Sequence, residues 1–248
     1  MRVIYILWIR QLKRYVRSRS RIVGSLGQPV LFLVALGFGF GPIYSRAGGG
    51  NYISFIAPGV IGMGIIFTAI FSGIELIWDR QFGFLKETLV APVSRMEIMI
   101  GRTLGGATVA FIQGVLVFFI TLAIGFRPAG AAGVFAALIF MFLTALLFTA
   151  LGTAIASRMQ DMTAFPIIIN FVVMPLFFLS GSLFPLAGLP QGILLAAKLD
   201  PLSYGIDGIR GALTGIYHFG FAADMFILVA IAALLLSLGT YLFSKIEI

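Results

Sequence analysis

Six long apolar runs limit what this chain can fold into more than any other feature of its sequence. The shortest run has 20 residues, and a helix of that length reaches about 30 Å, the thickness of the hydrocarbon core of a bilayer. Hydrophobic residues make up 60% of the chain and charged residues 10%, against about 45–50% and about 25% in soluble domains. A water-soluble fold of this size has too little interior to bury that much hydrocarbon. The runs are Ile22–Tyr44, Ile53–Trp78, Thr103–Phe126, Val134–Ser157, Met162–Leu186 and Met225–Ser244.

The lengths of these runs also select the kind of membrane fold. Inside lipid, every backbone N–H and C=O must pair within the protein, which leaves helices and closed barrels. A barrel strand crosses with about 9–11 residues, far fewer than these runs contain. Only short segments separate the runs. The sequence therefore predicts one all-α membrane domain over residues 1–248, with six transmembrane helices and no soluble domain.

The distribution of charge predicts the orientation of these helices. Seven of the 17 cations lie within the first 21 positions, directly before an apolar run, which is a membrane-orienting pattern and not a nucleic-acid surface. With the N-terminus inside, 13 cations lie on cytoplasmic segments and four, Arg46, Arg127, Lys198 and Arg210, lie outside. We therefore expect both termini in the cytoplasm and the chain in the cell membrane. The first run is too long for a signal-peptide h-region of about 7–15 residues and is expected to stay as an anchor.

Residues 3–17 have the pattern of an amphipathic helix. At 100° per residue, an apolar face centred on Leu12 separates from a face of cations. Such a helix lies along the membrane interface, with aromatic rings at headgroup depth and cations toward anionic lipid. A basic tail that only sets orientation is the alternative, but it needs no such periodicity. The apolar face holds Ile4, Tyr5, Trp8, Ile9, Tyr15 and Val16, and the cationic face holds Arg10, Lys13, Arg14 and Arg17.

The segment 79–102 is the longest predicted cytoplasmic loop. Its middle reads GFLKETLVAPVSR from Gly83 to Arg95, a short amphipathic helix that Pro92 ends because proline cannot continue the helical hydrogen bonds. Such a helix is either a connector at the interface or a docking surface for a soluble partner, and the spacing alone leaves both open.

The segment 187–224, between the last two runs, is too short and too charged to span, yet too apolar for an ordinary loop. It contains LPQGILLAAKL over 189–199 and LSYGIDGIRGALTGIY over 202–217, separated by Asp200 and Pro201. Pro185 and Pro190 precede these pieces. Short re-entrant or interfacial helices on the outer side fit best, provided that protein or water covers their backbone ends.

Several kinds of chemistry have no sequence support. None of the four lysines follows a glycine, so the chain has no G-x-x-x-x-G-K-[ST] loop and is not a P-loop ATPase by itself. An intramembrane serine protease is excluded because no G-x-S occurs and the one histidine, His218, is best read as a surface residue of the outer segment. Without cysteine, an H-E-x-x-H motif or a histidine cluster, a metal site is unsupported.

Polar residues inside the runs are few. Glu75 either reaches the interface or pairs with Arg80, with a coupling or substrate-contact role as the alternative. Gln113 and Asn170 are expected to form hydrogen bonds between helices. A carrier driven by protons or sodium ions usually needs more buried ionisable groups than these.

The chain resembles the membrane subunits of ABC-2 type exporters, in particular their daunorubicin-resistance branch of drug exporters. The resemblance covers nearly the whole length. It rests on the basic amphipathic start that leads into Gly27-Gln28-Pro29, on Asp79-Arg80 followed by GFLKETLVAPVSR and Gly101-Arg102, and on SGSLFPLAGLP over 180–190 with Asp200-Pro201 and Asp207–Arg210 downstream.

The resemblance implies how such a chain works. Residues 3–17 would be an elbow helix, with Trp8, Arg10, Arg14 and Arg17 at the interface, and the 79–102 loop would dock a separate ATP-binding cassette subunit. ATP and Mg²⁺ would bind to that partner, and no cofactor to this chain. Two membrane subunits, as a homodimer or a pair with a homologue, would open a path for a drug-like, lipid-linked or other amphipathic cargo. Transmission of the ATPase stroke would rest on Asp79, Arg80, Gly83, Glu87, Pro92 and Arg95, and gating of the outer exit on Pro185, Pro190, Asp200, Pro201, Asp207 and Arg210.

Two other functions remain open at this point. One is a membrane assembly or scaffold protein that transports nothing, and the other is a carrier or channel that works without ATP. The residues of a cargo site cannot be assigned, because the Phe, Leu, Ile, Ala and Gly of the runs pack helices as readily as they line a path.

Overall fold

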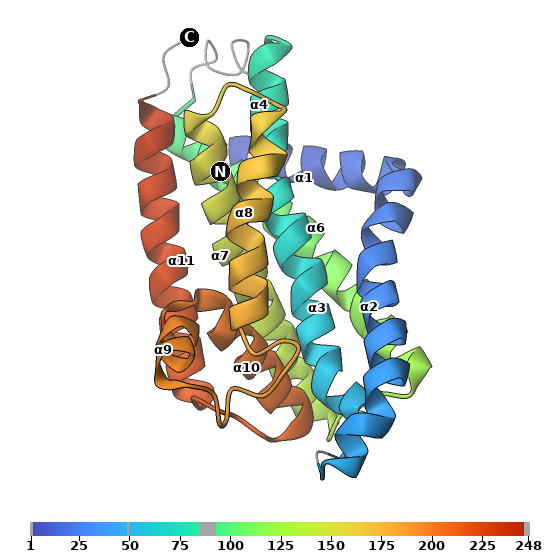
Figure 1. Ribbon diagram of the computed structural model, residues 1–248. Coiled ribbons are helices and arrows are strands. Elements are labelled where there is room, and N and C mark those ends of the chain that lie inside the picture. Colours follow the sequence, from blue (N-terminus) through green and yellow to red (C-terminus); the bar gives the residue numbers. More distant parts are fainter. Residues whose placement is uncertain (1, 49, 85–92, 246–248) are drawn as a thin grey trace.

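The computed structural model describes residues 2–48, 50–84 and 93–245, and within these ranges every regular element is a helix (Figure 1). The helices are α1 (Arg2–Arg17), α2 (Arg19–Arg46), α3 (Tyr52–Phe71), α4 (Ile74–Gln81), α6 (Arg95–Ile124), α7 (Ala131–Arg158), α8 (Ala164–Leu179), α9 (Gln191–Leu199), α10 (Pro201–Thr214) and α11 (Phe221–Ser244). The all-α prediction is thus confirmed for the described residues.

Five segments are long and apolar enough to cross a membrane. They are α2, the continuous segment Tyr52–Gln81 made of α3 and α4, α6, α7 and α11, with 24 to 30 residues each. The fifth predicted run differs, because only 16 of its residues form a helix, α8, which reaches about 24 Å. The chain leaves the helix at Ser180, and Gly181 follows with φ +71°, a left-handed conformation that favours glycine. The sixth span therefore stays a prediction.

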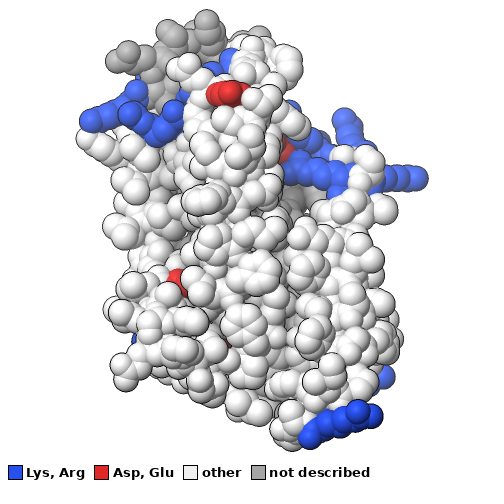
Figure 2. Space-filling view, viewed as in Figure 1, with Lys and Arg blue, Asp and Glu red and all other residues white. Residues whose placement is uncertain are grey.

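The Tyr52–Gln81 segment occupies the centre of the bundle. Its most apolar window is 83% buried, against 17% for α2 and for α11, which leave many of their large apolar side chains exposed. Figure 2 shows that Lys and Arg gather toward the two ends, and that the surface between them is mostly uncharged, with a small acidic patch visible near mid-height. Such a mostly uncharged surface is what lipid requires.

Small residues allow α7 to pack against the junction of α3 and α4. A Cβ added at Gly73 would lie 2.4 Å from the carbonyl oxygen of Gly152, and one added at Gly152 would lie 2.4 Å from the carbonyl oxygen of Ile70. Real Cβ atoms are not found this close to backbone. The two helices thus meet backbone to backbone, as small residues permit in membrane bundles.

Helix α1 lies across the bundle near the end where the described chain also finishes (Figure 1). It packs on α6, where an added Cβ at Gly101 would lie 3.0 Å from Cα of Ile4. Trp8 Nε1 donates to Thr108 Oγ1 at 3.0 Å, and Tyr15 Oη donates to Gln113 Oε1 at 2.8 Å. The predicted hydrogen bond of Gln113 between helices is confirmed. That of Asn170 is wrong, because its side chain is exposed on α8 and makes no such bond to described residues.

Helix α1 buries part of its surface against the protein and leaves part of the predicted apolar face exposed. Leu7 and Tyr15 are its buried residues, whereas Tyr5 and Val16 are exposed. The prediction assumed that the apolar face lies in lipid, but α6 selects the face whose residues fit between its own small side chains. Tyr5 and Val16 remain on the exposed surface of the helix.

Candidate functional site

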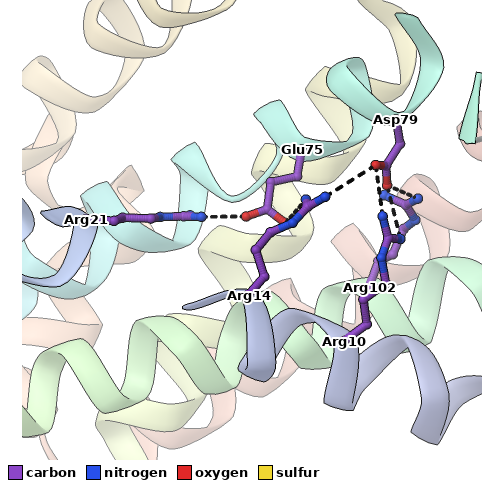
Figure 3. Close-up of polar contacts among 6 residues, drawn as sticks. All are labelled: Arg10, Arg14, Arg21, Glu75, Asp79 and Arg102. Carbon is purple, nitrogen blue, oxygen red and sulfur yellow. Dashed lines mark hydrogen bonds and ion pairs between the residues drawn. The ribbon is translucent and has the colours of Figure 1, made fainter. Parts of the chain in front are cut away.

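Six charged side chains from four helices meet beside the start of the 82–94 segment (Figure 3). We call them the ion-pair cluster. The two carboxylates lie one turn apart on α4, and the guanidinium groups come from α1, α2 and α6. The members are Arg10 and Arg14 of α1, Arg21 of α2, Glu75 and Asp79 of α4, and Arg102 of α6.

Asp79 is the acceptor that α1 and α6 share. Its Oδ2 accepts from Arg102 Nη2, and its two oxygens accept from both terminal nitrogens of Arg10 at 3.1 and 3.3 Å. Arg14 Nη2 lies 3.8 Å from Oδ1. Asp79 and Arg102 are each 4% exposed, so this pair is screened little by solvent. Breaking such a pair on one side only is costly, because the other charge stays buried.

Glu75 forms the second centre of the cluster. Arg14 Nη1 lies 3.2 Å from Oε2, and Arg21 Nη1 lies 2.6 Å from Oε1. The Glu75 side chain is 4% exposed, whereas those of Arg14 and Arg21 are 39% and 31% exposed. Two carboxylates therefore hold four guanidinium groups, and the excess positive charge is on the more exposed members. This excess suits an interface with anionic lipid.

The suggested pairing of Arg80 with Glu75 is wrong, whereas the predicted coupling role of Arg80 stays a prediction. Arg80 instead donates to the carbonyl oxygens of Ser157 and Met159, both at 2.9 Å. These groups end α7, where carbonyls lack helical partners and a cation is favourable. Five residues on a helix turn the side chain by about 140°, so Glu75 and Arg80 face apart. Arg80 thus fixes α4 to the end of α7.

The remaining residues of the predicted coupling loop lie before, within and after positions 85–92, which are outside the described residues. Gly83 follows α4 with φ +81°, and Arg95 Nη1 donates to the carbonyl oxygen of Ser244 at 2.6 Å, at the end of α11. Ser94 caps α6 by accepting from the backbone N–H of Glu97. Glu87 and Pro92 lie outside the described residues, so their assignment stays a prediction.

Of the predicted interfacial residues, the structure brings Arg10 and Arg14 into the cluster and places Trp8 against α6. Arg17 is exposed and makes no ion pair within the described part of the chain. Sequence reasoning did not assign Arg21 or Arg102 to the site. Arg102 was visible only as part of the Gly101-Arg102 motif, because its partner Asp79 is 23 residues away on another helix.

The predicted outer segment lies at the other end of the bundle, where Figure 1 shows α9 and α10. Pro190 precedes α9, Pro201 is the first residue of α10, and Pro185 lies in the connection after α8. Asp207 accepts from the backbone N–H groups of His218 and Phe219 at 2.8–2.9 Å. The His218 side chain is exposed, as expected.

Arg210 of α10 is a partly buried cation of this end. Its Nη2 donates to the carbonyl oxygen of Gly181 at 2.7 Å, and the guanidinium lies 4.3 Å from the ring centre of Phe55. Burial lowers the pKa of Arg210 to about 10, which leaves it charged at neutral pH. No carboxylate within the described ranges forms an ion pair with it.

Asp200 caps α10 and lies outside the five spans. Its Oδ1 accepts from the backbone N–H of Leu202 at 2.8 Å, while its buried Oδ2 has no partner among the described residues. Burial raises the pKa of Asp200 to about 7. Because the folded pKa is above the unfolded value of about 3.8, the charged form is disfavoured in the fold, and stability falls as the pH rises from about 4 to 7.

We therefore expect Asp200→Asn to melt above the wild type at pH 8, by a gap that closes near pH 4. The asparagine oxygen keeps the cap of α10 without a buried charge. Melting is followed by size exclusion of heated samples in neutral detergent. Asp200→Ala is the control and should be less stable than Asp200→Asn by about 0.5–2 kcal/mol at both pH values, because it lacks the cap. A lower melting temperature for Asp200→Asn at both pH values would contradict the assignment.

Within the described ranges, no group of three or more His, Cys, Asp or Glu side chains could hold a metal ion. The members of the ion-pair cluster pair with each other, and Arg80, Asp207 and Arg210 bond to backbone. The arrangement is suited to mechanical connection between helices, and nothing in it resembles a nucleophile with its base.

Comparison with known proteins gives a consistent result. The sequence profile of the family described as ABC-2 type transporter matches residues 2–214. Nodulation protein J of Rhizobium leguminosarum bv. trifolii is 29% identical over 213 residues, 85% of this chain and 78% of that protein. The transport permease ycf38 of Pyropia yezoensis is 30% identical over 200 residues, which is 78% of this chain and 68% of that protein. The transport permease ycf38 of Cyanophora paradoxa is 30% identical over 203 residues, which is 81% of this chain and 69% of that protein.

Proposed function

The chain belongs to the ABC-2 type transporter family, and on that premise we propose that it is the membrane-spanning permease subunit of an exporter driven by a separate ATP-binding subunit. The observation that carries the proposal is the ion-pair cluster. It connects α1, α2, α4 and α6 next to the 82–94 segment, where the partner would dock. The sequence itself has no P-loop, so the energy would come from the partner.

A displacement of the docking segment would reach the bundle by two routes. One runs through Asp79, which holds Arg10 of α1 and Arg102 of α6. The other runs through Arg80, which is bonded to the end of α7. Since α4 continues α3 in one segment of 30 residues, a movement at Gln81 would act on the centre of the bundle. These contacts are suited to transmit force because buried ion pairs rearrange in discrete steps.

The complete exporter would contain two permease subunits, identical or homologous, and two ATPase subunits that bind ATP and Mg²⁺. α8 would complete a sixth span, together with the turn after it, and α9 and α10 would be re-entrant helices on the outer side. Both termini would lie in the cytoplasm and the complex in the cell membrane. The cargo would be drug-like, lipid-linked or otherwise amphipathic, since the chain offers apolar surface in every span.

A paired substitution in the 79–102 loop tests the proposal. The chain is produced together with any P-loop ATPase encoded in a neighbouring reading frame, and copurification and ATP hydrolysis are measured in proteoliposomes. Because these side chains would hold the ATPase, the Glu87→Ala, Arg95→Ala double variant should lower copurification or hydrolysis about tenfold, which corresponds to about 1.4 kcal/mol. Asp161→Ala, an exposed acid in another loop at the same end, is the control and should leave both unchanged.

The outcomes separate the alternatives. Equal coupling in the double variant and the wild type rejects the assignment of the loop. No copurification of any P-loop ATPase with the wild type favours a scaffold protein. Movement of an amphipathic dye into proteoliposomes that contain the chain alone, without ATP, favours a carrier or channel.

A further inference from the structure

A cavity at the end of the bundle opposite the ion-pair cluster has the composition of a ligand site. We call it the distal cavity. It has a volume of about 410 Å³ and lies between the end of α2, the start of α3, the connection after α8, and α10 with the turn that follows it. Its walls include Tyr44, Phe55, Leu186, Ser203, Arg210 and Tyr217. A volume of this size is in the range of small-molecule sites.

Arg210 is the one cation on the wall of this cavity within the described residues, and Asp207 attracts it without forming an ion pair with it. Its Nη2 is occupied by the carbonyl oxygen of Gly181, its face lies over Phe55, its Nε is buried without a partner, and Nη1 makes no hydrogen bond to described residues. A partly buried guanidinium group with a buried, unpartnered Nε is a favourable place for an anion. The donors that remain point to a ligand that supplies one.

The neighbouring groups do not supply that anion. Asp207 also lines the cavity, but its two oxygens accept three hydrogen bonds from the backbone N–H groups of His218 and Phe219, and it forms no ion pair with Arg210. The other titratable groups on the wall are Tyr44, Tyr217 and His218, none of which is an anion at neutral pH. The Ser203 hydroxyl is buried on the same wall and has the Asp200 carboxyl as its neighbour. It is a second polar group of the cavity, about two helical turns from Arg210 along α10.

The rest of the wall is apolar. Tyr44, Phe55, Leu186 and Tyr217 present rings and aliphatic carbons, and Phe55 packs on Tyr44 with ring centres 5.8 Å apart. Apolar surface with a small number of placed polar groups is the usual form of a binding site for an amphipathic molecule. We infer that the distal cavity binds an amphiphile with an anionic phosphate or carboxylate head, which pairs with Arg210 and accepts from Ser203.

This inference does not depend on an ATPase partner. The same chemistry has two sources, an anionic lipid of the bilayer or an anionic molecule that the protein moves. In either case the head must be held by Arg210 and the apolar part by the aromatic wall. A free anion such as glycerol 3-phosphate lacks the apolar part and should bind at least tenfold more weakly than an amphiphile with the same head.

Binding is measured by isothermal titration of the full chain in neutral detergent. The probes are dihexanoyl phosphatidylglycerol, which is anionic, and dihexanoyl phosphatidylcholine, which has the same acyl chains but no net charge. We expect phosphatidylglycerol to bind at least tenfold tighter. Arg210→Met should abolish that preference and Arg210→Lys should keep part of it, while Ser203→Ala should weaken binding several-fold. Equal affinities for the two probes, or an unchanged preference in Arg210→Met, would overturn the inference.

Two further variants keep the test decisive. Arg46→Gln removes an exposed cation of the same end that does not line the cavity, and should leave binding unchanged. If Arg210→Met fails to fold, because Gly181 loses its donor, Ala187→Trp fills the cavity without touching Arg210 and should abolish binding; retained binding in that variant excludes the cavity. Native mass spectra identify the source of the ligand. A lipid that copurifies with the wild type and not with Arg210→Met indicates a bilayer lipid. If no lipid copurifies with the wild type and the probe still binds, the ligand is a transported anion.

Discussion

Replacement of Asp79 by asparagine is expected to destabilise the folded protein by about 3–5 kcal/mol. The change leaves the Arg102 guanidinium buried, at 4% exposure, without its carboxylate, and it also releases Arg10 of α1. Because folded proteins are stable by only about 5–15 kcal/mol, a loss of this size should remove most of the monodisperse protein after mild heating. Size exclusion of heated detergent extracts measures the loss.

A double variant separates stability from transmission. Asp79→Leu with Arg102→Met removes both buried charges, and such replacements restore stability in other proteins. We expect this variant to melt within a few degrees of the wild type and yet to lose coupled ATP hydrolysis, since α1 is no longer held to α4 through Asp79. Asp161→Asn, an exposed acid whose bonds are local to Thr163, is the control for a charge change at the same end. A single Asp79→Asn variant as stable as the control would contradict the cluster geometry.

Addition of one methyl group at Gly152 is the second change with a large expected effect. The new Cβ in Gly152→Ala would lie 2.4 Å from the carbonyl oxygen of Ile70 and 2.8 Å from its Cα. Backbone cannot yield as a side-chain end does, so α7 and the junction of α3 and α4 must separate. We expect a loss of about 1–3 kcal/mol, seen as a lower melting temperature in detergent.

Gly39→Ala is the matched control for that change. Gly39 lies inside α2, another spanning helix, and an added Cβ there meets nothing within 4 Å. Alanine is favoured over glycine in a helix by about 0.5–1 kcal/mol, so this variant should melt at or above the wild-type temperature. If the two alanine variants melt alike, the close contact between α7 and the α3–α4 junction is absent.

Much of the fold follows from the lengths of the apolar runs alone. Five of the six runs contain a helix that is long enough to cross a bilayer, because hydrocarbon thickness imposes that length. The run at Met162–Leu186 shows the limit of this reasoning. Hydropathy does not indicate that Gly181 takes a left-handed conformation and turns the chain. The run of 25 residues therefore contains a helix of only 16 residues, followed by a turn.

The candidate site was predicted in part. The basic face of residues 3–17 and the motif at Asp79 were each recognised, but their contact was not, since Arg10 and Asp79 are 69 residues apart and no local period relates them. The same limit explains the wrong suggestion that Glu75 pairs with Arg80. Arg80 is close to Glu75 in sequence, but the residues that bond to Glu75 are Arg21 and Arg14, which are 54 and 61 positions away.

The order of charges in the cluster has a consequence for movement. Arg14 pairs with Glu75 at 3.2 Å and also lies 3.8 Å from Oδ1 of Asp79, so its guanidinium group stands between the two carboxylates. Arg21 of α2 holds Glu75 independently of α1, and Arg102 of α6 holds Asp79. A small displacement of α1 against α4 can therefore transfer Arg14 from Glu75 to Asp79 while each carboxylate keeps a cation.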